Sequence, residues 1–166
     1  LFYSLDGGST WDQLLLITTV NGQDVNVLDV AFTYENLNVV LYIGLESDPM
    51  TSGAYGLFRA ELIAGVWSLS RDGSYGATDG IVDITTNANR DTLIFLNTDP
   101  GIWPINNVQV KDVSSGTWTS SVIGPYAGGY GTAITMGDGY VFLAIDEQIH
   151  TIPIDFSMPW NLAYTY

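Results

Sequence analysis

The sequence of 166 residues contains no cysteine and few cationic side chains. Without cysteine it can form no disulfide, no thiolate metal site and no cysteine nucleophile. Lysine and arginine together number four against 18 acidic residues, so the formal net charge is −14 with histidine neutral. Such a surface repels phosphate backbones and anionic lipid headgroups, so the sequence predicts no nucleic-acid binding and no attachment to an anionic membrane.

Long apolar runs are also lacking. The longest, Leu14 to Val20, contains two threonines and is far shorter than the roughly 20 residues of a membrane-spanning helix, so we expect no membrane insertion. No signal peptide is visible at Leu1, and we expect the chain to be a processed or partial product. Few lysines and arginines among many glycine, asparagine, threonine, aspartate and tyrosine residues are typical of extracellular, virion-surface or cell-surface proteins, which is the location that we expect.

Apolar residues make up 46% of the chain, enough for one folded domain with a substantial core. They form short runs rich in valine, isoleucine, tyrosine and phenylalanine, and no run sustains a helical period. Turn residues such as Gly137-Asp138-Gly139 separate them, and Asp-Gly between two apolar runs predicts a hairpin. The sequence therefore predicts an all-β fold.

Four tryptophans mark a repeat, at positions 11, 67, 118 and 160. Each follows a short strand and a turn of polar or small residues, and a further pair of strands lies upstream of each later copy. The pattern predicts one domain over 1–166. It consists of a half-blade at 1–20 and three four-stranded blades at about 24–70, 80–123 and 131–166, or fourteen strands in all.

The stretch Ser-Leu-Asp-Gly-Gly-Ser-Thr-Trp at residues 4–11 resembles the Asp-box of sialidases and other β-propellers, including sortilin and the xyloglucan hydrolases. Ser4, Asp6, Gly8 and Trp11 match the motif. The resemblance implies a partial β-propeller of about three and a half antiparallel blades, in which Asp6 accepts hydrogen bonds from its own turn and Trp11 is buried. A β-sandwich of the same hairpins is the alternative.

An open arc of blades would leave a sheet edge and a blade face exposed. We therefore expect other protein chains, or a longer chain, to complete the propeller. The resemblance places ligands on the face formed by the long loops. These loops carry Tyr55, Tyr75, Trp103, Tyr126 and Tyr130 beside carboxylates. Exposed aromatic rings among carboxylates suit sugars, so the sequence predicts glycan binding. The alternative is that these rings cover the ends of the core.

Two aspartates are the candidates for catalysis. Asp29 and Asp83 hold matched positions on two expected inner strands, and a glycosidase needs a pair of carboxyl groups. The interpretation that we favour is that each caps nearby backbone amides. Sialidase activity is not expected, because that family holds its substrate with a cluster of arginines, whereas the three arginines here lie in three separate segments.

A metal ion and a catalytic histidine find weaker support. Asp72 and Asp79 bracket a loop that could offer oxygen ligands to calcium, but its spacing departs from the EF-hand pattern. We therefore expect no cofactor, with calcium as the alternative. His150 is the only histidine; it shares a strand face with Ile152 and Ile154, and we expect a structural role.

The sequence thus favours a non-enzymatic β-propeller module with a structural or adhesive role and carbohydrate as its ligand. A glycoside hydrolase with catalytic residues partly outside this stretch is one alternative. A purely structural assembly subunit is the other.

Overall fold

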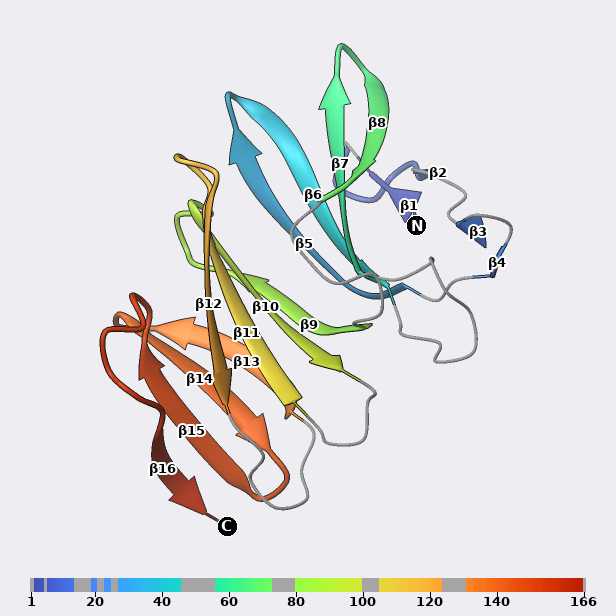
Figure 1. Ribbon diagram of the computed structural model, residues 1–166. Coiled ribbons are helices and arrows are strands. Elements are labelled where there is room, and N and C mark those ends of the chain that lie inside the picture. The colour runs from blue at the N-terminus through green and yellow to red at the C-terminus, as the bar shows by residue number, and fades with distance from the viewer. Residues whose placement is uncertain are drawn as a thin grey trace.

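The computed structural model describes an all-β protein, as the sequence predicts (Figure 1). It describes residues 2–4, 6–13, 19–20, 23–24, 27–45, 56–72, 80–99, 105–123 and 131–165. All strand pairs in these ranges are antiparallel. The described residues contain no helix of the length and hydrophobicity that crossing a membrane requires.

Three four-stranded sheets follow one another along the chain, each with its strands paired in sequence order. Sheet I contains β5 (Val27–Glu35), β6 (Asn38–Leu45), β7 (Gly56–Ile63) and β8 (Val66–Arg71). Sheet II contains β9 (Gly80–Thr86), β10 (Thr92–Asp99), β11 (Ile105–Asp112) and β12 (Thr117–Ile123). Sheet III contains β13 (Gly131–Gly137), β14 (Tyr140–Ile145), β15 (Gln148–Pro153) and β16 (Asn161–Thr165).

The sheets stand side by side in an arc, the arrangement of a partial β-propeller, and the two ends of the chain lie at opposite ends of the arc (Figure 1). Two shorter sheets precede sheet I: the N-terminal ribbon of β1 (Phe2–Tyr3) and β2 (Asp12–Gln13), and a hairpin of β3 (Thr19–Val20) and β4 (Gln23–Asp24). The predicted count of fourteen strands is too low, because the described residues contain sixteen. The Asn-Gly pair at 21–22 is a strong signal for the additional hairpin.

Apolar clusters fill the spaces between successive sheets. Because side chains alternate along a strand, β6 directs Tyr42 toward sheet II and Ile43 to the opposite face, into the cluster that contains Trp67. The cluster between sheets I and II contains Val40, Tyr42, Leu57, Ile81, Ile84, Leu93 and Phe95. The cluster between sheets II and III contains Ile94, Leu96, Val108, Val110, Ile123, Ile134, Val141, Leu143, Ile145 and Ile152. The protein therefore has one continuous series of layers rather than a single central core.

The inner strands β5, β9 and β13 carry an irregularity in their pairing at the same place. The register shifts between Val27 and Asp29 in β5, beside Asp83 in β9, and between Gly131 and Ala133 in β13. Such a bulge redirects the side chain that follows it. Asp29, Asp83 and Ala133 thus hold matched positions on three neighbouring strands.

The later tryptophans pack toward the sheet that precedes them. Trp67 meets the ring of Tyr3 in the ribbon edge-on at 5.7 Å between centroids, Trp118 lies against the cluster between sheets I and II, and Trp160 donates from Nε1 to Ser121 Oγ of sheet II at 3.1 Å. Trp11 is 63% exposed, so the prediction that it is buried is wrong. No sheet of the described residues lies before the ribbon to receive its ring.

Gly44 sets how closely sheets I and II approach. A Cβ atom at this position would lie 2.7 and 2.9 Å from Ile81 side-chain atoms and 3.1 Å from Ile84 Cδ1. We predict that Gly44→Ala lowers the free energy of unfolding by about 1 to 3 kcal/mol, because the added methyl group forces apart a packed interface. Chemical denaturation measures the change. Gly137→Ala is the control and should have little effect, since no heavy atom lies within 4 Å of its Cβ position. Equal losses in both variants would contradict the prediction.

Candidate functional site

The inner-strand carboxylates connect neighbouring sheets. Asp29 Oδ2 accepts a hydrogen bond from the backbone N–H of Ile84 at 2.8 Å, and Asp83 Oδ2 accepts one from the N–H of Ile134 at 2.7 Å. Asp29 Oδ1 also accepts from the N–H of Val30 at 2.8 Å. Each aspartate therefore binds the residue that follows the matched bulge of the next sheet. These bonds support the interpretation that the two aspartates cap backbone amides.

Asp29 and Asp83 also act on each other. Burial is the largest cause that raises the pKa of Asp83 to about 6, and a hydrogen bond to Asp29 and repulsion from its charge add to the shift. A glycosidase places its two carboxyl groups about 5 to 9.5 Å apart so that a sugar or water fits between them. Here Asp29 Oδ2 and Asp83 Oδ2 already accept the backbone N–H groups of Ile84 and Ile134, so both carboxyl groups are engaged between sheets. These contacts favour a structural role for the pair over the hydrolysis of a glycoside.

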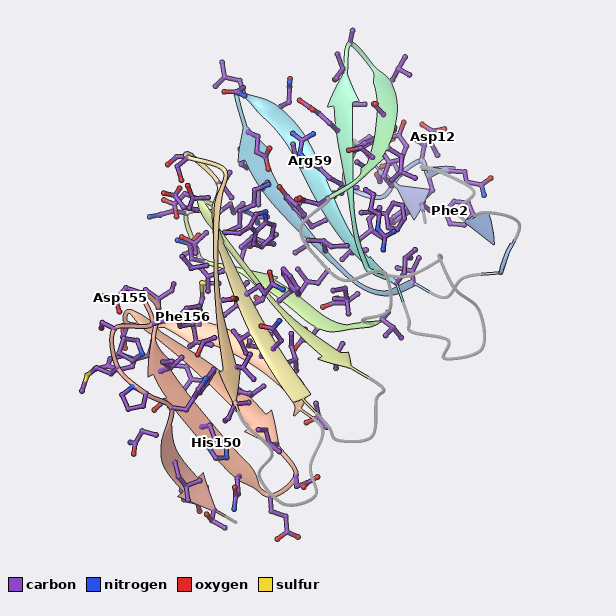
Figure 2. The ribbon with its side chains drawn as sticks, in the orientation of Figure 1. Phe2, Asp12, Arg59, His150, Asp155 and Phe156 are labelled. Carbon is purple, nitrogen blue, oxygen red and sulfur yellow. The ribbon has the colours of Figure 1, made fainter. Side chains whose placement is uncertain are left out.

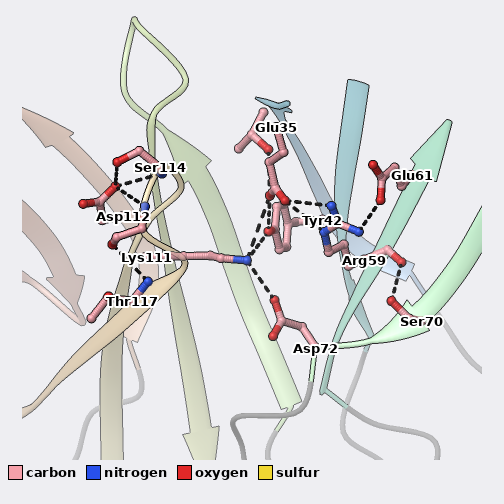
Figure 3. Close-up of polar contacts among 12 residues, drawn as sticks. Glu35, Tyr42, Arg59, Glu61, Ser70, Asp72, Lys111, Asp112, Ser114 and Thr117 are labelled. Atoms are coloured by element: carbon pink, nitrogen blue, oxygen red, sulfur yellow. Dashed lines mark hydrogen bonds and ion pairs between the residues drawn. The ribbon is translucent and has the colours of Figure 1, made fainter. Parts of the chain in front are cut away.

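A cluster of charged side chains connects sheets I and II (Figure 3). In sheet I, the guanidinium of Arg59 donates from Nε and Nη2 to Glu35 Oε2 at 3.1 and 2.7 Å, and from Nη1 to Glu61 Oε2 at 2.7 Å. Tyr42 donates from Oη to Glu35 Oε1 at 2.5 Å. Glu35, near the tip of the β5–β6 hairpin, is thereby held by two strands of its own sheet.

Lys111 completes this cluster from β11 of sheet II. Its Nζ contacts Tyr42 Oη and lies 3.4 Å from Asp72 Oδ2 and 3.9 Å from Glu35 Oε1. The residue is only 7% exposed, so its charge needs these partners. Burial, followed by the hydrogen bond to Glu35, raises the pKa of Tyr42 above its usual range. Tyr42 therefore stays a neutral hydrogen-bond donor, and the cluster ties two sheets together without leaving a free nucleophile among its members.

Sequence reasoning missed this cluster. Its signal in the sequence is weak: Arg59 lies between Phe58 and Ala60, and Lys111 follows Val110, whereas Glu35 ends its strand. Asp72, the candidate calcium ligand, belongs to the cluster through Lys111. Asp79 lies outside the described residues. The predicted sugar-binding rings lie outside them as well: Tyr55, Tyr75, Trp103, Tyr126 and Tyr130.

Aspartate turns precede three of the tryptophans. In the first, Asp6 Oδ1 accepts the backbone N–H of Thr10 at 2.9 Å, as predicted. Ser4 Oγ accepts the N–H of Gly8 at 2.7 Å in the same turn. Two later turns have the same feature. Asp112 Oδ1 accepts the N–H of Ser114 at 2.9 Å, and Asp155 Oδ1 accepts the N–H of Ser157 at 3.0 Å. Asp6 thus builds a turn.

His150 lies within sheet III (Figure 2). It is 2% exposed on β15, where it is paired with Leu143 on the face toward sheet II. Burial lowers the pKa of its imidazole, and its Nε2 is 3.0 Å from Gln148 Oε1. A buried ring with this environment is a structural histidine.

A groove opens between sheets II and III at the end that carries their hairpin turns. One part has a volume of about 390 Å³, with Met136 and Ile154 as apolar lining and Thr86, Asn89, Asp138 and Tyr140 as polar lining. The second part, of about 480 Å³, lies on the other side of Ile154 and is lined by Thr92, Asp112, Ser115, Thr117 and Thr119. Among these linings there is no cationic side chain, so the groove offers hydroxyl, amide and carboxylate groups over an apolar floor.

Comparison with the models of known protein families gives no match, and neither does comparison with curated protein sequences. The geometry described above therefore has to support any functional conclusion.

The hydrogen bonds of the Asp6 turn predict how the pKa of the Asp6 carboxyl group responds to substitution. The backbone N–H of Thr10 is the first cause that lowers the pKa of Asp6 to about 2, followed by the Thr10 hydroxyl and the Ser4 hydroxyl. We predict that Thr10→Val raises this pKa toward 3.8, because a donor to the carboxylate is lost. NMR titration of the carboxyl carbon measures it. Thr117→Val, in the matched turn before Trp118, is the control and leaves the pKa of Asp6 unchanged.

The Asp29–Asp83 pair makes stability depend on pH. An acid whose pKa is raised on folding binds its proton more tightly in the folded state, so the protein becomes less stable as the pH rises from 3.8 to about 6. We predict that Asp29→Asn makes this decline smaller, since repulsion of the charged Asp83 is removed. Urea denaturation between pH 3.5 and 7 measures the effect. An unchanged pH dependence in the variant would contradict the coupling.

Proposed function

We propose that this chain is a non-enzymatic structural and adhesive module, part of a β-propeller that further β-structure completes. The observation that carries the proposal is the use of its ionisable groups. Asp29 and Asp83 bind backbone amides of neighbouring sheets, and Lys111 and Arg59 are paired within the charged cluster. Groups of the kind that usually perform catalysis are here committed to holding sheets together.

The resemblance of residues 4–11 to an Asp-box supports the same proposal. Hydrogen bonds at Asp6 are those of a turn that orients two strands, and turn formation requires no ligand. The scarcity of cations and the many glycine, asparagine and threonine residues favour an extracellular, virion-surface or cell-surface location. A glycoside hydrolase is the rival proposal, and measurement of turnover separates the two.

A neutral carbohydrate is the ligand that we propose for the groove between sheets II and III. Sugars present hydroxyl groups at their edges and apolar C–H faces, and aromatic or apolar surfaces with a few polar groups bind them. Tyr140 is 47% exposed, and Asn89 and Asp138 line the same hollow as Met136 and Ile154. The lack of cations in this lining favours neutral over acidic glycans.

Glycan binding provides the test of this proposal. We predict that a glycan array detects neutral oligosaccharides, that Tyr140→Ala lowers their affinity about tenfold because a stacking face is lost, and that no bound glycan is cleaved. Tyr164→Ala is the matched control, since Tyr164, 56% exposed on β16, is a surface tyrosine that is not among the groove residues.

Three outcomes would redirect the proposal. Loss of binding on Trp103→Ala but not on Tyr140→Ala would move the site to the predicted loops. Cleavage of a glycan that is lost on Asp83→Asn would favour the hydrolase instead. Absence of binding to any glycan would leave a purely structural subunit.

A further inference from the structure

One face of sheet I is incompletely covered. Val30, Ile84 and Ile134 are the residues that follow the matched bulges of the three inner strands. Ile84 and Ile134 are 4% and 5% exposed beneath the preceding sheet, whereas Val30 is 42% exposed. Tyr34, on the same face of β5, is 56% exposed. Sheet I covers Ile84 of sheet II, and sheet II covers Ile134 of sheet III. The matched residue of sheet I, Val30, is left exposed.

The backbone at this position differs in the same way. The N–H groups of Ile84 and Ile134 each donate to an aspartate of the preceding sheet. The N–H of Val30 donates to the carboxylate of its own neighbour, Asp29. Among the described residues, sheet I thus lacks the carboxylate that its successors receive from the sheet before.

The N-terminal ribbon indicates which strands would supply the missing carboxylate. β1 and β2 are joined by an aspartate turn that ends in Trp11, as β11 and β12 are joined by the turn of Asp112 that ends before Trp118. The ribbon therefore corresponds to the outer two strands of a sheet. β1 pairs with β2 alone among the described strands, and the inner two strands of such a sheet would pair with its other edge and lie over Val30.

We propose that this open place binds a β-hairpin whose inner strand carries an aspartate that accepts the N–H of Val30. The proposal rests on the proposed function, because it names the β-structure that completes the module. Both filled interfaces of the chain use an aspartate for this contact, and a charged acceptor makes the stronger hydrogen bond. The face of the hairpin toward sheet I is apolar, to cover Val30 and Tyr34.

A second copy of this chain, docked through sheet III, does not fit the same place. Its inner strand would present Ala133 at the matched position, and alanine has no oxygen to accept the N–H of Val30. The row of aspartates runs from sheet I to sheet II and ends at sheet III, so the occupant comes from β-structure that carries its own carboxylate.

The chain itself supplies a probe for this hairpin. Residues 80–99 form the β9–β10 strand pair that covers Ile134 and carries Asp83. We predict that a copy of residues 80–99, joined ahead of Leu1 through a flexible Gly-Ser linker, slows hydrogen exchange of the Val30 amide at least about tenfold and raises Tm. The linker holds the copy at a high effective concentration. NMR of the 15N-labelled protein measures the exchange.

Matched variants separate the aspartate from general coverage. Asp83→Ala in the added copy alone should remove most of the protection of Val30, and Val30→Lys in the main chain should prevent docking. Leu37→Lys is the control, because Leu37 is fully exposed at the tip of the β5–β6 hairpin and should leave docking unchanged.

A second fusion protein provides an independent test if the added copy of residues 80–99 does not fold. It carries residues 27–45, the β5–β6 pair with Asp29. Failure of both fusions to protect Val30, or equal protection with and without the aspartate, overturns the proposal. These outcomes are distinct from those that test the proposed function: cleavage of a glycan would contradict the non-enzymatic role without altering the exchange rate of Val30.

Discussion

The arrangement of the sheets depends on one repeated contact, the hydrogen bond from a backbone N–H of one inner strand to the carboxylate of the sheet before. It is 2.8 Å long at Asp29 and 2.7 Å at Asp83. A bulge in each inner strand places the aspartate and exposes the amide. Because an unpaired buried N–H is costly, this contact also fixes how one sheet is displaced along the next. Gly44 then allows the apolar faces to meet closely.

The two interfaces between neighbouring sheets contain different kinds of side chain. Between sheets I and II, Lys111 spans the gap and meets three partners in the charged cluster. Between sheets II and III, Ile152 belongs to an apolar cluster, and hollows open on both sides of Ile154. A buried charge needs close partners, and Lys111 finds them in Tyr42, Asp72 and Glu35. The groove between sheets II and III lies beside the apolar cluster, at Ile154, and is lined mostly by polar residues.

Periodicity and turn chemistry predicted much of the fold, because strands and hairpins are local features. The Asp138-Gly139 turn and the strands around Trp67 and Trp118 are where the pattern placed them. The burial of Trp11 was predicted wrongly, because burial depends on a neighbouring sheet and not on the motif. The charged cluster could not be predicted, since it joins Glu35 and Lys111, which only the folded sheets bring together.

A raised carboxyl pKa within a cleft commonly marks a catalytic site, and Asp83 shows why geometry has to be considered with it. Its pKa is raised first by burial and then by Asp29, while the N–H of Ile134 opposes the shift. The carboxylate of Asp83, which is costly to ionise, is also the acceptor that positions sheet III through the N–H of Ile134. Its perturbation is therefore a consequence of stacking sheets through buried carboxylates. The end of the row at Ala133 gives this stacking a direction, from sheet I toward sheet III, and makes the open face of sheet I the place where the same contact is missing.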